Sequence, residues 1–132
     1  MSNLCTSSWS ALFAASKAGT LDVLPVRISV GVPKFWPQAA AFPYIEALAP
    51  VGIRHLEGQV FEAAFLRRLD DIGVDAILDQ LRSLQAEAVP VPLALTCFEP
   101  AGEPCHRRIV ARWLGGVPEW EPPTNQLRIE EL

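Results

Sequence analysis

The sequence lacks several features that would place the protein at a membrane or outside the cell. Its apolar runs stay well short of the ~20 residues that a membrane-spanning helix needs. Residues 1–5 carry no positive charge of the kind that precedes the apolar core of a signal peptide. The three cysteines are too few, and odd in number, for a disulfide scaffold. These absences predict a cytoplasmic protein that contacts no membrane and keeps its thiols free.

Lysine is scarce, and the positive charge that exists is scattered. Two lysines and nine arginines stand against fifteen acidic residues, which gives a net charge of −4. The isoelectric point is about 5.1. A protein that holds nucleic acid by neutralising its phosphates carries a basic patch instead. We therefore expect no tight nucleic-acid binding, while a ligand the size of a nucleotide stays open.

The usual nucleotide-binding and hydrolase motifs are also missing. The chain contains no Gly-rich phosphate loop, no dinucleotide fingerprint and no serine nucleophile elbow. No internal repeat or low-complexity linker interrupts it. Its 132 residues, half of them hydrophobic, are enough to bury one core. We expect a single domain over residues 1–132, with a surface tail at 117–132.

Two segments have the pattern of strands. In Leu24–Val30 apolar and polar residues alternate, so one face is apolar and the other polar. Leu93–Phe98 is nearly all apolar, which is typical of a strand buried on both faces of a parallel sheet. Ile53–Leu56 has the composition of a third, short strand, and Pro43–Leu48 that of a helical turn.

Three stretches predict helices. Apolar residues recur at helical spacing over 61–72 and again over 74–84, with Gly73 between them. Pro104–Leu114 predicts a third helix, because proline suits the first helical position. Residues 6–19 form either a short helix or a strand followed by a helical turn. This order of elements predicts a small three-layer α/β domain with a mainly parallel sheet.

The strongest chemical signature is the pair of motifs Cys97-Phe98-Glu99 and Cys105-His106-Arg107-Arg108. In open α/β sheets, ligands bind beyond the carboxyl ends of the strands, and the first motif lies at such an end. The second motif opens a helix, whose free N–H groups and positive dipole end favour an anion. A thiol at that place, beside His106 and Arg107, is expected to have a lowered pKa. The candidate catalytic residues are therefore Cys97, Glu99, Cys105 and His106.

The helical wheel assigns directions to the second motif. At about 100° per residue, His106 shares a face with Ile109 and Val110, and it points inward toward the strand end. Arg107 flanks the edge of that face, and Arg108 lies on the outer side. We therefore expect Arg107, or Arg108, to meet a ligand.

Structural roles for the same residues stay open. His106 also suits a structural histidine bonded to loop carbonyls, Cys97 a small core residue, and Glu99 a cap for loop N–H groups. A zinc site would need a remote fourth ligand besides Cys97, Cys105 and His106, and the spacing matches no usual zinc pattern. We expect no metal and no cofactor. A redox pair of Cys97 and Cys105 is a further alternative.

A second candidate surface follows the first predicted strand. Arg27 and Ser29 share one face of that strand, and Lys34 comes next in a stiff loop. If this strand neighbours Leu93–Phe98, its carboxyl end opens onto the same crevice. Arg27, Lys34 and Arg107 would then form a cationic rim that binds a small anion. The alternative is a solvated strand face beside a packed aromatic loop.

With these segments in hand, the chain resembles the domain-of-unknown-function family 488, in particular its small actinobacterial-type members. The matching pieces lie within residues 24–120 and include Val26-Arg27-Ile28-Ser29-Val30-Gly31-Val32-Pro33-Lys34-Phe35, Leu95-Thr96-Cys97-Phe98-Glu99 and Gly102-Glu103-Pro104-Cys105-His106-Arg107-Arg108. The resemblance implies a Rossmann-type α/β domain whose activity is unassigned. It also implies a common site at the matched positions Arg27, Ser29, Pro33, Cys97, Glu99, Cys105, His106 and Arg107. Residues 1–20 match only loosely.

Two functions agree with these observations. The first is an enzyme or ligand-binding domain for a phosphate-bearing small molecule such as a nucleotide. The arginines would hold the anion, and Cys105 or Glu99 with His106 would perform any chemistry. The second is a non-catalytic protein-interaction module, in which the Cys-His-Arg cluster is a structural lock and a protein partner binds a surface such as Phe35-Trp36. Whether the chain is an enzyme stays open.

Overall fold

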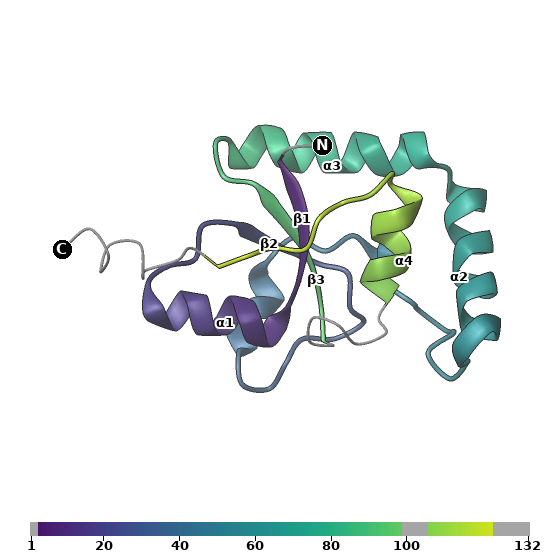
Figure 1. Ribbon diagram of the computed structural model, residues 1–132, viewed down its shortest axis with the longest axis horizontal. Coiled ribbons are helices and arrows are strands. Elements are labelled where there is room, and N and C mark those ends of the chain that lie inside the picture. Colours follow the sequence, from purple (N-terminus) through teal and green to yellow (C-terminus); the bar gives the residue numbers. More distant parts are fainter. Residues whose placement is uncertain (1–2, 99–105, 123–132) are drawn as a thin grey trace.

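The computed structural model describes residues 3–98 and 106–122, and it shows an α/β domain built on a parallel sheet (Figure 1). The strands are β1 (Leu4–Ser8), β2 (Leu24–Arg27) and β3 (Leu93–Cys97). They are ordered β1-β3-β2, and both outer strands run parallel to β3. All five residues of β3 are buried, as expected for a strand covered on both faces. The prediction of a three-layer α/β domain with a parallel sheet is confirmed.

The N-terminal segment forms a strand that leads directly into a helix, so the second of its two predicted forms is nearer the structure. Helix α1 (Trp9–Ala18) is a full helix rather than a single turn. Its N-terminus is capped by Ser8, whose side-chain oxygen accepts from the Ala11 N–H at 3.2 Å. Gly19 ends it in the left-handed conformation, with φ 74°.

The two amphipathic helices form as their apolar spacing predicts. They are α2 (Gly58–Ile72) and α3 (Val74–Ala88), and Gly73 separates them with φ 91°. The buried positions of α2 are Phe65 and Leu69, which come from the predicted stripe and are 0 % exposed. A fourth helix, α4, is described over His106–Trp113. Pro104, with which this helix was predicted to begin, lies outside the described residues.

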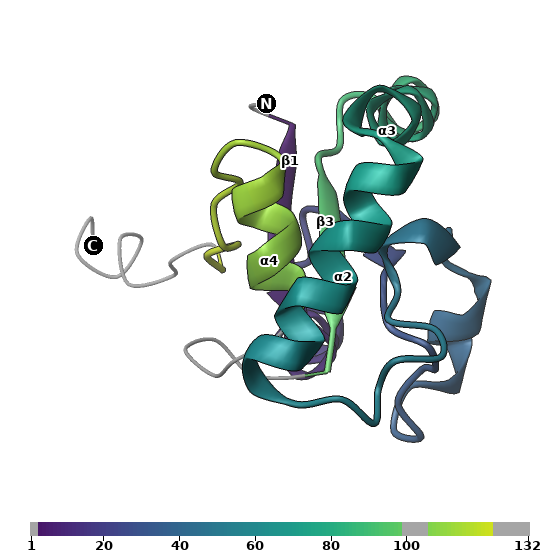
Figure 2. The ribbon, with the colours of Figure 1, turned by 90° about the vertical axis from the view of Figure 1, so that its right-hand side faces the viewer.

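Two apolar clusters lie on opposite faces of the sheet and define the layers. The larger one joins the sheet to α2, α3 and α4, and its buried members include Val26, Leu93, Leu95, Phe65, Ile77 and Val110. The smaller one joins the sheet to α1 and the aromatic loop, and its buried members are Cys5, Trp9, Leu12, Val23, Trp36, Ala39 and Ala94. Figure 2 shows α2 and α4 side by side on their face of the sheet.

The segment after α4 does not run over the surface as a loose tail. Glu119 forms a parallel bridge with Thr6 of β1. In this bridge the Thr6 N–H donates to the Pro118 carbonyl at 2.9 Å, and the Trp120 N–H donates to the Thr6 carbonyl at 2.7 Å. The Trp120 indole also donates to Asp22 at 2.9 Å. Residues 117–120 are therefore held against the outer edge of β1, where they extend the sheet by one bridge.

Two predicted strands differ from the structure. Strand β2 ends at Arg27 rather than Val30, because only one further hydrogen bond, from the Ile28 N–H to the Thr96 carbonyl, joins the chain to β3. The predicted strand at Ile53–Leu56 is a series of turns. The outer edge of β2 is instead bridged by Tyr44, opposite Arg27, so Ile53–Leu56 has no sheet edge to pair with. The helical turn predicted near residue 45 is a short 3-10 helix over Glu46–Leu48.

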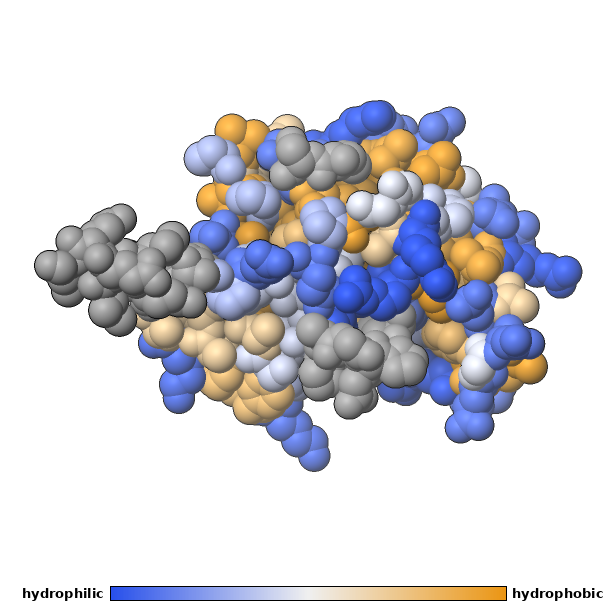
Figure 3. Space-filling model, viewed as in Figure 1, coloured by the Kyte–Doolittle hydropathy of each residue, from blue (hydrophilic) through white to orange (hydrophobic). Residues whose placement is uncertain are grey.

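The surface is chemically uneven. Within the described ranges no helix combines the length and the apolar character needed to cross a membrane. Figure 3 shows strongly hydrophilic residues gathered over α4 on one face of the molecule, whereas apolar residues lie over α1. Arg108 and Arg112 contribute to the charge of α4, with side chains 42 % and 69 % exposed.

Candidate functional site

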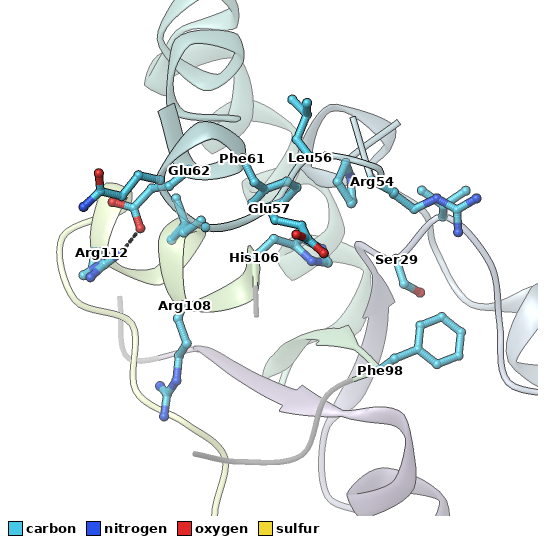
Figure 4. A pocket seen from close by; sticks show the side chains of 15 residues that line it. Ser29, Arg54, Leu56, Glu57, Phe61, Glu62, Phe98, His106, Arg108 and Arg112 are labelled. Atoms are coloured by element: carbon cyan, nitrogen blue, oxygen red, sulfur yellow. Dashed lines mark hydrogen bonds and ion pairs between the residues drawn. The ribbon is translucent and has the colours of Figure 1, made fainter. Parts of the chain in front are cut away.

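A pocket of about 970 Å³ lies beyond the carboxyl ends of β2 and β3 (Figure 4). Ser29 and Val30 follow β2, and Phe98 follows β3. The remaining walls are the turn before α2 and the first turns of α2 and α4. The lining residues are Ser29, Val30, Pro50, Arg54, Leu56, Glu57, Gly58, Gln59, Phe61, Glu62, Phe98, His106, Arg108, Ile109 and Arg112. The structure thus brings the two predicted surfaces to one end of the sheet, where parallel α/β folds bind ligands.

His106 reaches the pocket but is bonded into the fold. Its side chain is 7 % exposed, and its Nε2 donates to the Ile28 carbonyl at 2.5 Å. The ring also packs edge-on against Phe65, with centroids 5.6 Å apart. Burial lowers the pKa of His106 to about 4, the Ile28 carbonyl opposes that shift, and the charge of Arg107 adds to it. The bond to the Ile28 carbonyl agrees with the alternative of a structural histidine, and the ring is neutral at pH 7.

Arg107 is not at the rim of the pocket. It is 0 % exposed, and its Nε and Nη2 donate to the two carboxylate oxygens of Glu119 at 3.2 and 2.9 Å. Its Nη1 donates to the Cys97 sulfur at 2.9 Å. Thr6 donates to the same Glu119 carboxylate at 2.7 Å. Of the two arginines expected to meet a ligand, Arg107 is buried under residues 117–120, whereas Arg108 lines the pocket.

The sulfur chemistry of the site also differs from the prediction. Cys97 is disulfide-bonded and 0 % exposed, so it carries no free thiol, and it does not line the pocket. Cys5 is free but buried, and burial, with the nearby Asp22 and Glu119 carboxylates, raises its pKa to about 12. Two of the candidate catalytic residues, Glu99 and Cys105, lie outside the described residues.

The expected cationic rim of Arg27, Lys34 and Arg107 does not form at the pocket. The Arg27 guanidinium lies over the Tyr44 ring at 4.6 Å and donates to the Ala40 carbonyl at 3.2 Å. Lys34 is exposed in its loop and does not line the pocket. The alternation of residues in the strand could not predict that Arg27 contacts Tyr44, because Tyr44 reaches the edge of β2 through the 3-10 turns.

Ser29 lies at the pocket, as predicted, with its hydroxyl already engaged. The hydroxyl donates to the Gly31 carbonyl at 2.5 Å and accepts from the Trp9 indole at 3.0 Å. A serine has one donor, so this side chain has no proton left for a ligand. Ser29 therefore shapes the pocket wall and can offer only a remaining lone pair.

The polar groups that remain available in the pocket were missed by sequence reasoning. Within residues 3–98 and 106–122, the side chains of Arg54, Glu57 and Gln59 line the pocket and make no hydrogen bond or ion pair. Figure 4 shows the Glu57 carboxylate turned toward His106, with Phe98 across the pocket. No pattern in the sequence marked them, since all three precede the helix predicted over 61–72 and Arg54 falls within the predicted strand Ile53–Leu56.

The other pocket arginines are partly neutralised. Arg112 pairs with Glu62 at 3.2 Å, and Arg108 approaches Glu119 at 3.6 Å. Both pairs are exposed enough that solvent screens them, so each arginine can exchange its partner at little cost. The lining therefore carries three arginines against two glutamates in a chain of net charge −4.

Metal ligands do not gather in the parts of the chain that are described. No group of three or more His, Cys, Asp or Glu side chains there could hold an ion. Comparisons with protein-family models, with curated proteins and with solved structures found no match to this chain. The resemblance to family 488 stays a prediction.

Proposed function

We propose that this domain binds a small phosphate-bearing molecule in the pocket beyond β2 and β3. The observation that carries the proposal is the Arg54 guanidinium, which has no hydrogen-bond or ion-pair partner among the described residues and lies at a pocket that Arg108 and Arg112 also line. Guanidinium groups bind phosphate oxygens through paired, charge-assisted hydrogen bonds. A local excess of arginine in an acidic chain favours an anion at this place over the rest of the surface.

The dimensions of the pocket agree with a small ligand. A volume of about 970 Å³ lies within the usual range for small-molecule sites, about 300–1,000 Å³. Figure 4 shows Arg54 and Arg108 on opposite sides of the pocket, with their side chains extended away from each other. The apolar wall includes Leu56 and Phe61, which would exclude water from the ligand.

The geometry of the pocket supports ligand binding more directly than it supports catalysis. His106 is neutral and its Nε2 is occupied by the Ile28 carbonyl, so that nitrogen is not available for proton transfer. Roles for Cys105 and Glu99 in a reaction stay predictions. We therefore place the anion on the pocket arginines and leave the domain unassigned as an enzyme.

The test is calorimetric titration with inorganic phosphate, ribose 5-phosphate and AMP, after thermal-shift screening. We expect Arg54→Ala and Arg108→Ala each to weaken binding about tenfold or more, because each removes a charged hydrogen-bond donor. Arg82→Ala is the matched control, since Arg82 is an exposed arginine of α3 outside the pocket. Equal affinities for the Arg54, Arg108 and Arg82 variants would remove the anion from this pocket.

A non-catalytic protein-interaction module remains the second candidate, and one observation favours it. The described part of the Cys-His-Arg cluster is bonded within the fold, through Arg107 to Glu119 and through His106 to Ile28. Of the proposed Phe35-Trp36 surface, only Phe35 is exposed, at 50 %, because Trp36 is buried against α1. No thermal shift with any anion, together with loss of stability alone in Arg107→Met, would favour this candidate.

A further inference from the structure

Phe98 is an exposed aromatic ring on the wall of the pocket. It follows β3 directly, lines the pocket and is 45 % exposed. Figure 4 shows its ring beside Ser29 and across the pocket from Glu57. Phe61, the other phenylalanine that lines the pocket, already has an aromatic partner, because its ring stacks on Phe65 within α2 with centroids 5.7 Å apart. An apolar ring held at the mouth of a charged pocket offers a flat face to a ligand.

We propose that the ligand is a nucleoside phosphate whose base stacks on Phe98. This inference rests on the proposed function, because it takes the phosphate to be held by the pocket arginines. A phosphosugar or inorganic phosphate would use those arginines and leave the Phe98 ring in water. A nucleobase covers the ring, and base–aromatic stacking needs no particular base because every base has a π face.

The unpaired acidic group of the pocket fits the middle part of such a ligand. Glu57 is an acceptor without a donor among the described residues, and it lies across the pocket from Phe98. Sugar hydroxyl groups are donors that a carboxylate accepts readily. Ring, carboxylate and guanidinium then correspond to base, sugar and phosphate. A simple anion would gain nothing from Glu57, whose charge would repel it.

The experiment compares AMP, adenosine and ribose 5-phosphate by calorimetry on the full chain. Base stacking is expected to make AMP bind about five- to a hundredfold more tightly than ribose 5-phosphate. Phe98→Ala should remove most of this difference and leave the affinity for ribose 5-phosphate unchanged. Phe98→Leu should do the same while it keeps an apolar side chain of similar bulk, and Phe98→Tyr should retain the preference for AMP.

Phe35→Ala is the matched control, since Phe35 is the other strongly exposed phenylalanine and lies outside the pocket. It should leave all three affinities unchanged. Equal binding of AMP and ribose 5-phosphate, or AMP binding unaffected by both Phe98→Ala and Phe98→Leu, would overturn this inference while the proposed function stands. Adenosine binding as tightly as AMP would overturn the proposed function, and with it the phosphate part of this inference.

Discussion

Glu119 is an acidic partner of Arg107, an arginine at 0 % exposure, so its removal should be costly. In Glu119→Ala, Arg107 loses both carboxylate hydrogen bonds, at 3.2 and 2.9 Å, and remains at 0 % exposure. Thr6 loses its acceptor as well. Breaking a buried pair by removing one partner typically costs about 3–5 kcal/mol, because the other charge is left uncompensated. We expect a loss of about 3 kcal/mol in the free energy of unfolding.

Removing the arginine instead should cost less. Arg107→Met places an apolar chain of similar length in the buried site, and it leaves no buried charge. Glu119 then keeps the Thr6 hydroxyl, the nearby Arg108 and contact with water, since its side chain is 20 % exposed. We expect a loss of about 1–2 kcal/mol, mainly from hydrogen bonds that are no longer made. Glu119→Ala should therefore lower the free energy of unfolding more than Arg107→Met does.

Urea unfolding followed by circular dichroism measures both losses, with Glu121→Ala as a control at a nearby exposed carboxylate. The double variant should be no less stable than Glu119→Ala, because the stranded charge is then absent. A loss below about 1 kcal/mol for Glu119→Ala, or a greater loss for Arg107→Met, would refute the reasoning that the buried charge decides the cost.

Two further predictions concern titratable groups away from this pair. His106 has a folded pKa of about 4 against 6.5, so the unfolded chain takes up the proton first as the pH falls. Its contribution, up to about 3 kcal/mol, is present above pH 6.5 and is lost between pH 6.5 and 4. Urea unfolding across that range should show a flatter pH dependence for His106→Gln than for the unchanged protein. Cys5, whose pKa is raised to about 12, should resist iodoacetamide at pH 8 until urea unfolds the chain, and rapid labelling that Cys5→Ser abolishes would contradict its burial.

Local pattern predicted the elements whose faces are set by their own sequence. The stripes of α2 and α3 and the apolar run of β3 face a core regardless of what else surrounds them, and these predictions are confirmed. The order of strands and helices also predicted a mainly parallel sheet, and β2 and β3 are parallel neighbours in it. This arrangement brought Ser29 and His106 to one pocket, as expected.

Long-range contacts decided what the pattern missed. The helical wheel leaves Arg107 at an edge, but residues 115–117 turn the chain back along β1, with Gly115 and Gly116 at φ 99° and 104°. Glu119 is thereby carried over Arg107, twelve residues away in sequence. The spacing of residues within α4 cannot predict that the chain after the helix turns back along β1. Arg54 and Glu57 were missed for a related reason, since they lie in a turn without periodicity.

The position of β1 has a consequence for how the chain is assembled. Its partners lie far along the sequence, since Cys5 contacts Leu93 88 residues later and Thr6 meets Glu119 113 residues later. Contacts of such high sequence separation slow folding, because a long loop must close before they form. During synthesis β1 is made well before β3, the strand with which it pairs. Helices α2 and α3 are joined at Gly73, so their mutual contacts are local and can form before β3 is available to β1.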